Sequence, residues 1–253
     1  MIVLVTGASS GFGAAITRRF AADAHQVIAL GRRQDRLDAL ASEIGRERVH
    51  PLVLDVRDRD AVTAAISGLP CQLAEINVLV NNAGLALGLE PAQAAQLDAW
   101  EEMVDTNVKG VMYLTRAVLP GMVARNRGHV INMGSIAGVY PYPGGNVYGA
   151  SKAFVRQFSL NLRADLSGTK VRVTNIEPGL VGGTEFSAVR FGGDAERAAR
   201  MYLGADALTP DDVAEAVHWV ANLPARVNIN TLEMMPVTQT FGALVVNRTP
   251  TDR

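Results

Sequence analysis

The chain has 253 residues and a formal net charge of −1, with 48% apolar and 19% charged residues. This composition is ordinary for a globular protein and gives no reason to expect nucleic acid or an anionic membrane as a partner. The single cysteine, Cys71, excludes an internal disulfide and fits a reducing compartment. An apolar strand begins at Ile2 and no apolar run reaches the roughly 18 residues needed to span a bilayer. We therefore expect no signal peptide, no membrane span and a cytoplasmic location.

The first segment predicts a phosphate-binding turn. Ile2–Val5 is a short apolar run without polar residues, which is typical of a strand buried on both faces. Thr6–Gly13 follows, and then an amphipathic helix to about Ala24. Gly7 would permit a tight turn, Gly11 would let the backbone approach a pyrophosphate, and the helix N-terminus would offer free N–H groups. The spacing departs from G-x-G-x-x-G, so a plain strand–helix turn is the alternative.

The end of the second strand predicts the choice of cofactor. The strand Gln26–Leu30 leads into Gly31-Arg32-Arg33, where an acid would bind the ribose 2′-hydroxyl of NAD. Neither Asp nor Glu is present, and two guanidinium groups suit a 2′-phosphate. NADP is therefore the predicted cofactor. The alternative is that solvated arginines cap the next helix, predicted at Gln34–Gly45.

Polar residues follow the next two predicted strands. Asp55 comes directly after the strand Val49–Leu54 and could accept a hydrogen bond from an adenine amino group, although an exposed loop aspartate is equally common. Asn81–Gly84 follows the strand Ile76–Val80. Polar side chains at the end of a buried strand indicate a structural hydrogen-bond network that also touches the cofactor.

A tyrosine and a lysine four residues apart form the candidate catalytic centre. The helix predicted at Tyr148–Leu166 would place Lys152 beside the phenol of Tyr148. A free tyrosine has a pKa of about 10, and a neighbouring cation would lower it toward the range useful for general acid–base catalysis. Ser135 ends the strand Val130–Met133 and could hydrogen-bond a substrate oxygen. An ordinary surface Tyr–Lys pair is the alternative.

The remaining pattern predicts a single domain, residues 1–253, with a Rossmann fold: a doubly wound, seven-stranded parallel α/β sheet with helices on both faces. We expect one long helix, Trp100–Arg125, and a last helix capped at Thr209. The irregular stretch after Pro178-Gly179 predicts a substrate lid at about 180–208, and a C-terminal tail is expected at about 240–253. The other elements expected are the helix Asp60–Leu69 and the strands Val171–Ile176 and Thr231–Met235.

These motifs, in this order and spacing, resemble the short-chain dehydrogenase/reductase family over residues 1 to about 240. The resemblance implies a nicotinamide cofactor and a catalytic set consisting of Asn107, Ser135, Tyr148 and Lys152. It implies that Tyr148 is the general base for alcohol oxidation, that Lys152 also binds the nicotinamide ribose, and that Asn107 supports a water relay toward Lys152. The cofactor contacts implied by the motifs are Gly7, Ser9, Ser10, Gly11, Phe12, Gly13, Arg32, Arg33, Asp55, Val56, Asn82, Ala83, Gly84, Tyr148, Lys152, Pro178, Gly179, Val181 and Thr184.

Within the family, three further stretches resemble the NADP-dependent 3-hydroxy acid dehydrogenases, which oxidise L-serine and L-allo-threonine. These stretches are Thr115–Met122, Glu177–Ser187 and Asn228–Gln239. The resemblance also makes a homotetramer the expected assembly. Two alternatives are another short-chain reductase, for a ketoacyl thioester or a sugar, and a non-catalytic NADP-sensing regulator; no metal site is expected.

A 3-hydroxy acid needs a partner for its carboxylate, and Arg190 in the predicted lid is our candidate. Val189 and Phe191 flank Arg190 and could hold it against the pocket mouth, near Ser135 and Tyr148. Arginine binds a carboxylate through two parallel hydrogen bonds. The alternatives are that Arg190 is solvated and pairs with Glu185, or that backbone donors in 144–146 bind the acid.

Overall fold

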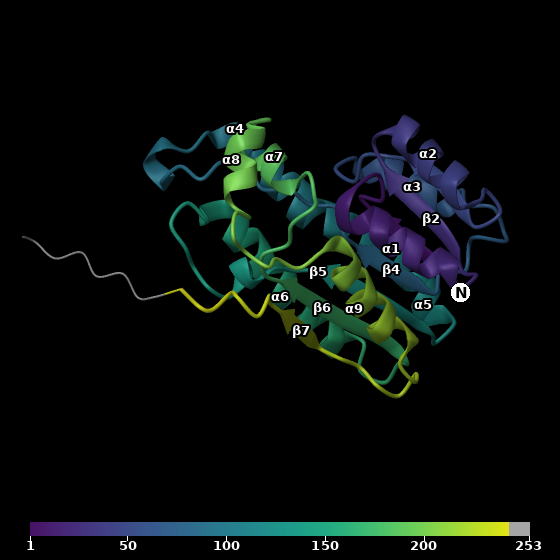
Figure 1. Ribbon diagram of the computed structural model, residues 1–253. Helices are drawn as coiled ribbons and strands as arrows, with labels where there is room; N and C mark the ends of the chain where they lie inside the picture. Colours follow the sequence, from purple (N-terminus) through teal and green to yellow (C-terminus); the bar gives the residue numbers. More distant parts are fainter. Residues whose placement is uncertain (243–253) are drawn as a thin grey trace, which may run out of the picture.

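All neighbouring strands in the sheet run parallel, in the order β3-β2-β1-β4-β5-β6-β7 (Figure 1). The computed structural model describes residues 1–242, so most of the expected C-terminal tail lies outside the described residues. The strand order reverses between β1 and β4, the kind of switch point at which open α/β sheets bind ligands. The strands are β1 (Ile2–Thr6), β2 (Gln26–Gly31), β3 (Val49–Val53), β4 (Val78–Asn81), β5 (Gly128–Met133), β6 (Val171–Pro178) and β7 (Thr231–Met234).

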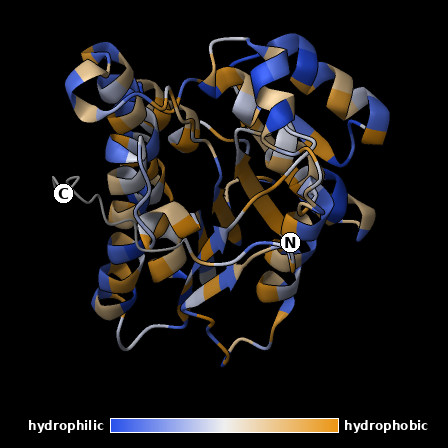
Figure 2. Ribbon diagram, turned by 60° about the vertical axis from the view of Figure 1, so that its left-hand side comes forward, coloured by the Kyte–Doolittle hydropathy of each residue, from blue (hydrophilic) through white to orange (hydrophobic). Residues whose placement is uncertain are grey.

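The central strands are apolar throughout because both of their faces are buried. Val3 and Val5 belong to the hydrophobic cluster on one face of the sheet, and Leu4 between them belongs to the cluster on the other face. Parallel pairing aligns Leu4 with Leu79 of β4, which lies on the same face as Leu4. Figure 2 shows that hydrophobic residues concentrate in these strands, whereas the helices carry both hydrophobic and hydrophilic residues.

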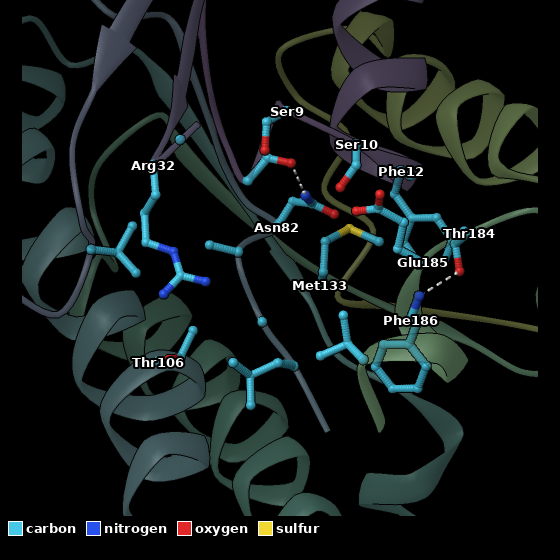
Figure 3. Close-up of a pocket in the computed structure, with 18 of the residues that line it drawn as sticks. Ser9, Ser10, Phe12, Arg32, Asn82, Thr106, Met133, Thr184, Glu185 and Phe186 are labelled. Carbon is cyan, nitrogen blue, oxygen red and sulfur yellow. Dashed lines mark hydrogen bonds between the residues drawn. The ribbon is translucent and has the colours of Figure 1, made fainter. Parts of the chain in front are cut away.

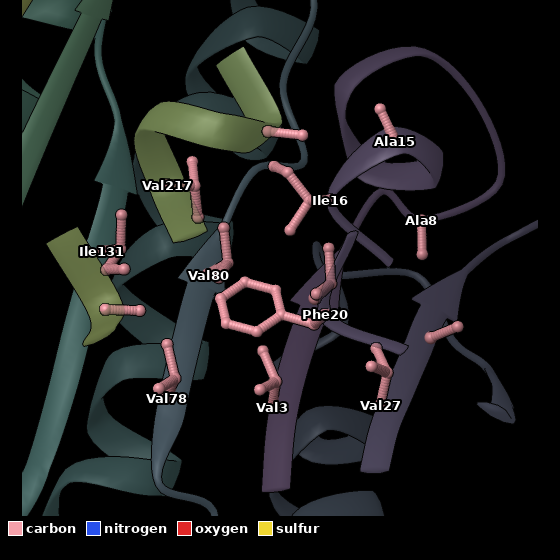
Figure 4. Packing of buried hydrophobic residues seen from close by; sticks show 14 of the residues in the cluster. Val3, Ala8, Ala15, Ile16, Phe20, Val27, Val78, Val80, Ile131 and Val217 are labelled. Atoms are coloured by element: carbon pink, nitrogen blue, oxygen red, sulfur yellow. The ribbon is translucent and has the colours of Figure 1, made fainter. Parts of the chain in front are cut away.

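Helices cover both faces of the sheet, as predicted. Phe20 of α1 is fully buried against Val3, Val78 and Val80 (Figure 4). Burying such a side chain stabilises the fold by about 1.5–3 kcal/mol. On this face lie α1 (Gly11–Ala22), α2 (Gln34–Ile44) and α9 (Pro210–Asn222); on the other lie α3 (Arg59–Ser67), α5 (Val111–Ala124) and α6 (Asn146–Asp165).

The prediction of one regular helix at Trp100–Arg125 is wrong in its interior. The helical path runs through α4 (Leu97–Val104), the π-helical segment η2 (Asp105–Gly110) and α5. A π-helical turn takes up an extra residue, and such turns are frequent at functional sites. A Cβ at Gly110 would lie 2.8 Å from the Val56 side chain, so the segment packs closely against the end of β3.

The predicted lid also contains more regular structure than expected. It contains two short helices, α7 (Phe186–Arg190) and α8 (Ala195–Arg200), where an irregular stretch was predicted. The helix α8 forms because Asp194 caps it by accepting a hydrogen bond from the Arg197 N–H. The predicted cap of α9 is confirmed, since Thr209 and Asp212 form a capping box. Short 3-10 turns occur at η1 (Ala92–Ala94) and η3 (Ile136–Gly138).

The helices of residues 1–242 are all too short or too polar to cross a lipid bilayer.

Candidate active site

A cavity of about 310 Å³ lies at the carboxyl ends of β1 to β5, where the strand order reverses (Figure 3). Its walls come from the turn after β1, the ends of the next strands, the start of α6 and the segment 184–189. Most predicted cofactor residues line this cavity; Gly13, Pro178, Gly179 and Val181 do not.

The glycine-rich turn has the geometry that a phosphate site requires. Gly7 and Gly11 adopt positive φ angles of 66° and 51°, which side chains disfavour. A Cβ at Gly13 would lie 2.2 Å from the carbonyl oxygen of Gly7, so only glycine fits there. The Ser10 side chain makes no capping hydrogen bond to α1, which leaves the helix N-terminus to an anion. Gly13 therefore supports the turn without lining the cavity.

The two arginines after β2 have different surroundings. Arg33 donates hydrogen bonds from Nη2 to the hydroxyls of Ser9 and Ser10, and from Nη1 to Glu185 at 2.9 Å. Arg32 lines the cavity, and within residues 1–242 no acid pairs with it (Figure 3). Arg33 is the N-cap residue of α2, as the alternative supposed, but its side chain makes no capping bond and its guanidinium binds Ser9, Ser10 and Glu185 instead.

The polar residues after β3 and β4 take part in separate networks. Asp55 lines the cavity and binds Arg57 through both carboxylate oxygens; burial would raise the pKa of Asp55, but Arg57 lowers it below its usual value. Asn82 donates from its side chain to the Thr6 carbonyl. Asn81 is buried and donates to Thr115 and Asn132, while Asn132 donates to Ser159 of α6. The predicted structural network is therefore present, and it links β4 and β5 to α5 and α6.

Tyr148 and Lys152 are both buried on α6, close to the end of β5. The Lys152 Nζ lies 5.9 Å from the centre of the Tyr148 ring and donates to the Met133 carbonyl at 2.9 Å. Burial lowers the pKa of Lys152 to about 8. The Ser135 hydroxyl accepts a hydrogen bond from the Ala137 N–H and faces the Tyr148 phenol.

We expected Lys152 to lower the pKa of Tyr148, and this expectation is wrong for the surroundings that the structure shows. Burial raises the pKa of Tyr148 to about 12, outweighing the Ser135 hydrogen bond and the Arg190 guanidinium, which both lower it. Tyr148 is therefore a neutral phenol at neutral pH. A phenol with this pKa can donate a proton to a developing alkoxide, but it needs further positive charge nearby to act as a base.

Asn107 is buried rather than solvent-facing. It lies in η2, where its Oδ1 accepts from the Leu85 N–H and its Nδ2 donates to the Leu85 carbonyl and to Ser151. A Cβ at Gly84 would lie 3.1 Å from Asn107 Oδ1 and 3.3 Å from Lys152 Nζ. Asn107 Oδ1 and Lys152 Nζ therefore both lie next to Gly84. Ser151, one residue before the lysine, is a neighbour of Asn107 that the sequence interpretation missed.

Arg190 is buried beside the Tyr148 ring, so the alternative of a solvated residue paired with Glu185 is wrong. Its Nη2 donates to the Tyr142 hydroxyl at 2.9 Å, and its Nε donates to the Gly88 carbonyl. Its guanidinium carbon lies 5.5 Å from the Tyr142 ring centre and 5.6 Å from that of Tyr148. Glu185 pairs instead with Arg33 and Arg36.

The other alternative for the substrate acid, the segment 144–146, is packed against a neighbouring loop. The Asn146 side chain donates to the Glu90 carbonyl, and a Cβ at Gly144 would lie 2.3 Å from the Leu89 carbonyl oxygen. Tyr142, two residues before Gly144, is the part of this loop that reaches Arg190.

Of the predicted cofactor residues after β6, Thr184 lines the cavity. The Gly179 N–H donates to the Met234 carbonyl, and Val181 pairs with Leu208.

An ion pair between the partly exposed Arg156 and the buried Glu177, which the sequence interpretation missed, lies behind the site. Glu177 of β6 is fully buried and accepts hydrogen bonds from Arg156 and Asn175. A Cβ at Gly134 would lie 3.1 Å from the Glu177 side chain, so the pair backs the residue before Ser135. Arg156 follows Tyr148 by eight residues on α6 and shares its face, and this spacing was the signal available in the sequence.

Comparisons with known proteins give consistent matches over nearly the whole chain. The family model described as short chain dehydrogenase matches residues 1–192. The NADP-dependent 3-hydroxy acid dehydrogenase YdfG of Salmonella typhimurium (strain LT2) is 66% identical over 248 residues, covering 98% of this chain and 100% of the relative. Serine 3-dehydrogenase of Agrobacterium fabrum is 49% identical, covering 97% of this chain and 98% of the relative.

A solved structure has the same fold. It is described as the closed form of serine dehydrogenase complexed with NADP+, is 63% identical, and has a TM-score of 0.97 over 98% of this chain and 100% of that chain.

The ion pair between Arg156 and Glu177 leads to a prediction about how the free energy of unfolding depends on pH. We expect Arg156→Met to lower the free energy of unfolding by about 1–3 kcal/mol, because a buried carboxylate loses its charged partner. Burial raises the pKa of Glu177, which means that the charged carboxylate is less favourable in the folded protein than in the unfolded chain. The free energy that Glu177 contributes to folding therefore falls as pH rises through its raised pKa. The loss should therefore be larger at pH 8 than at pH 5, as measured by urea unfolding at one protein concentration.

Arg18→Met is the matched control, because Arg18 forms an ion pair with Glu43 in which both side chains are about half exposed. Such pairs contribute about 0–1 kcal/mol. If Arg156→Met and Arg18→Met lowered the free energy of unfolding equally at both pH values, burial of the Glu177 carboxylate would not be what makes its ion pair important.

Proposed function

Since the chain belongs to the short-chain dehydrogenase family, we propose that it is an NADP-dependent oxidoreductase that interconverts 3-hydroxy acids and 3-oxo acids. Its substrates would be L-serine, L-allo-threonine and 3-hydroxypropionate-like acids. The observation that carries the substrate class is the buried guanidinium of Arg190 beside the Tyr148 ring, which has no acidic partner within residues 1–242. A buried cation in this position needs an anion, and the carboxylate of a hydroxy acid supplies one.

The cavity fits NADP on its own chemistry. The turn glycines leave the backbone open to a pyrophosphate, and Thr184 contributes the nearest side chain, 3.5 Å from where a Cβ at Gly11 would be. Arg32 is a cation at the end of β2 that pairs with no acid in the described part of the chain, as a 2′-phosphate site would require. Asp55 remains a candidate partner for the adenine amino group.

The catalytic chemistry is divided between the cofactor and five side chains. NADP, when bound, accepts or supplies the hydride. Ser135 would hold the reacting oxygen, and Tyr148 would take its proton in oxidation and return it in reduction. Lys152 and Arg190 both lie within 5.9 Å of the Tyr148 ring centre, and of these two cations Arg190 is the one that favours the phenolate. Asn107 would relay protons by way of water near Lys152.

Arg190 also favours this substrate class over the alternatives. A sugar carries no carboxylate, so it would leave the buried guanidinium without an anion. The carbonyl end of a ketoacyl thioester is likewise uncharged. A regulator without catalysis would have no need of Tyr148 and Lys152 lining one cavity with Ser135 hydrogen-bonded to the phenol.

Segment 180–208 would act as the substrate lid of a single domain, because it carries Arg190 at the pocket mouth. A homotetramer is the proposed assembly, and it is supported by half-exposed apolar side chains on α4 and α5, among them Leu97, Met112 and Val123. A cytoplasmic location is supported by the free cysteine, Cys71.

Cofactor preference is tested by Arg32→Ala. Removing a charge-assisted hydrogen bond to phosphate costs about 1.5–3 kcal/mol, so the KM for NADP should rise roughly ten- to a hundredfold. The KM for NAD should change little, because NAD lacks the 2′-phosphate. Steady-state kinetics with both cofactors decide it, and equal losses would exclude Arg32 as the phosphate partner.

Substrate class is tested by Arg190→Met with L-serine and its methyl ester. The variant should lower kcat/KM for L-serine by about 2–3 kcal/mol in transition-state stabilisation, or roughly 30- to 150-fold, with a much smaller loss for the ester. Arg197→Met is the matched control, because Arg197 is also in the lid but stacks on Phe191 instead. If acid and ester weaken equally, Arg190 does not bind the carboxylate.

A further inference from the structure

The short helix α7 carries an anchoring charge at each of its two ends. Glu185 immediately precedes the helix, and Arg190 is its last residue. The glutamate is held on the cofactor side of the cavity and the arginine on the substrate side. A helix of five residues spans only about 7.5 Å, so it moves as one unit. A displacement of Glu185 at one end therefore also displaces Arg190 at the other.

At the cofactor side, two arginines bind the same carboxylate. Arg33 Nη1 lies 2.9 Å from one Glu185 oxygen, and Arg36 Nη1 lies 2.5 Å from the other. Hydrogen bonding from Arg36, more than that from Arg33, lowers the pKa of Glu185, so this side chain is charged at neutral pH. We call Arg33, Arg36 and Glu185 the latch, because they join the lid to the β2–α2 turn across the mouth of the cavity.

The two latch arginines differ in a way that allows an experiment. Arg33 also binds Ser9 and Ser10 and lines the cavity, so replacing it would disturb the cofactor site directly. Arg36 lies outside the cavity lining, and its side chain donates a hydrogen bond to Glu185. A change at Arg36 therefore affects the latch without removing a cavity residue.

At the substrate side, Arg190 is held by two contacts that fix its direction. The Tyr142 hydroxyl and the Gly88 carbonyl each accept one hydrogen bond from it, and the Gly88 N–H donates to the Arg190 carbonyl. These partners lie on the loops after β4 and after β5, whereas the latch involves the start of α2. Both anchors are needed to fix a short helix at two ends, and the latch side chains are each about 40% exposed.

We propose that Glu185 is a positioning residue for substrate binding: through Arg33 and Arg36 it latches α7 so that Arg190 meets the carboxylate of the hydroxy acid. This inference rests on the proposed function of Arg190. The latch leaves Arg32 as the main partner of the 2′-phosphate, because Arg33 is already bound to a carboxylate. Loss of the latch should therefore weaken hydroxy-acid binding without weakening NADP binding.

The experiment compares Arg36→Met and Glu185→Gln with wild type. Each variant should raise the KM for L-serine roughly three- to tenfold, the range expected for losing exposed but networked ion pairs. In Arg36→Met, which changes no residue of the cavity lining, the kcat and KM for L-serine methyl ester and the dissociation constant of NADP should stay within about twofold. In Glu185→Gln, Arg33 loses its acidic partner, so NADP should bind no more weakly than it does to wild type. In the double variant, Arg36→Met should add nothing to Glu185→Gln, because both remove the same interaction.

Glu43→Gln is the matched control. It breaks another solvent-exposed Arg–Glu pair, with Arg18, on the outer surface of α1 and α2, and it should change none of these constants. Equal losses for serine and its ester in the latch variants, or no loss at all, would overturn the proposal.

The Arg190→Met kinetics separate this outcome from failure of the proposed function. If Arg190→Met distinguishes acid from ester while the latch variants do not, only the latch is overturned. If Arg190→Met itself shows no distinction, the carboxylate role fails and the latch proposal falls with it.

Discussion

The hydrogen bond from the buried Lys152 ammonium to the Met133 carbonyl is the interaction on which the site depends. It joins α6 to the end of β5, and so sets Tyr148 and Ser135, which lie on different elements, at one point of the sheet edge. Arg156 repeats the attachment about one turn further along the helix by binding Glu177 of β6. Because Lys152 and Glu177 are both buried, these bonds hold the helix more firmly than contacts between fully exposed groups would.

The charges around the cavity are arranged in two separate groups. Near the glycine turn, Arg32 faces the cavity while Arg33 is engaged by Glu185. Around the phenol, Lys152 and Arg190 each lie within 5.9 Å of the ring centre, and burial raises the Tyr148 pKa to about 12. The phenol is thus a proton donor in this state and becomes a base only when more positive charge lies beside it. The helix α7 connects the two groups, because Glu185 precedes it and Arg190 is its last residue.

Much of this could be predicted from the sequence, because the signals are local. Continuous apolar runs mark parallel strands buried on both faces, and a four-residue spacing places Lys152 beside Tyr148 on a helix. The π-helical segment around Asn107 escaped prediction, since the apolar periodicity of a regular helix hides one extra residue. The alternative that paired Arg190 with Glu185 is wrong, and the actual partner Arg36 lies 149 residues from Glu185 along the chain, where sequence spacing gives no signal. The raised pKa of Tyr148 depends on burial, which side-chain spacing does not reveal.

The most direct test is the initial rate of NADP reduction by the purified protein with L-serine, with Tyr148→Phe as the blank. This variant keeps the ring but removes the proton-transferring hydroxyl, so NADP should still bind while turnover falls at least roughly a hundredfold. The account predicts serine-dependent reduction by wild type that is faster with NADP than with NAD. It would be contradicted by an absence of serine-dependent reduction, by faster turnover of a sugar or a ketoacyl thioester, or by a Tyr148→Phe variant that keeps more than about a tenth of the wild-type rate.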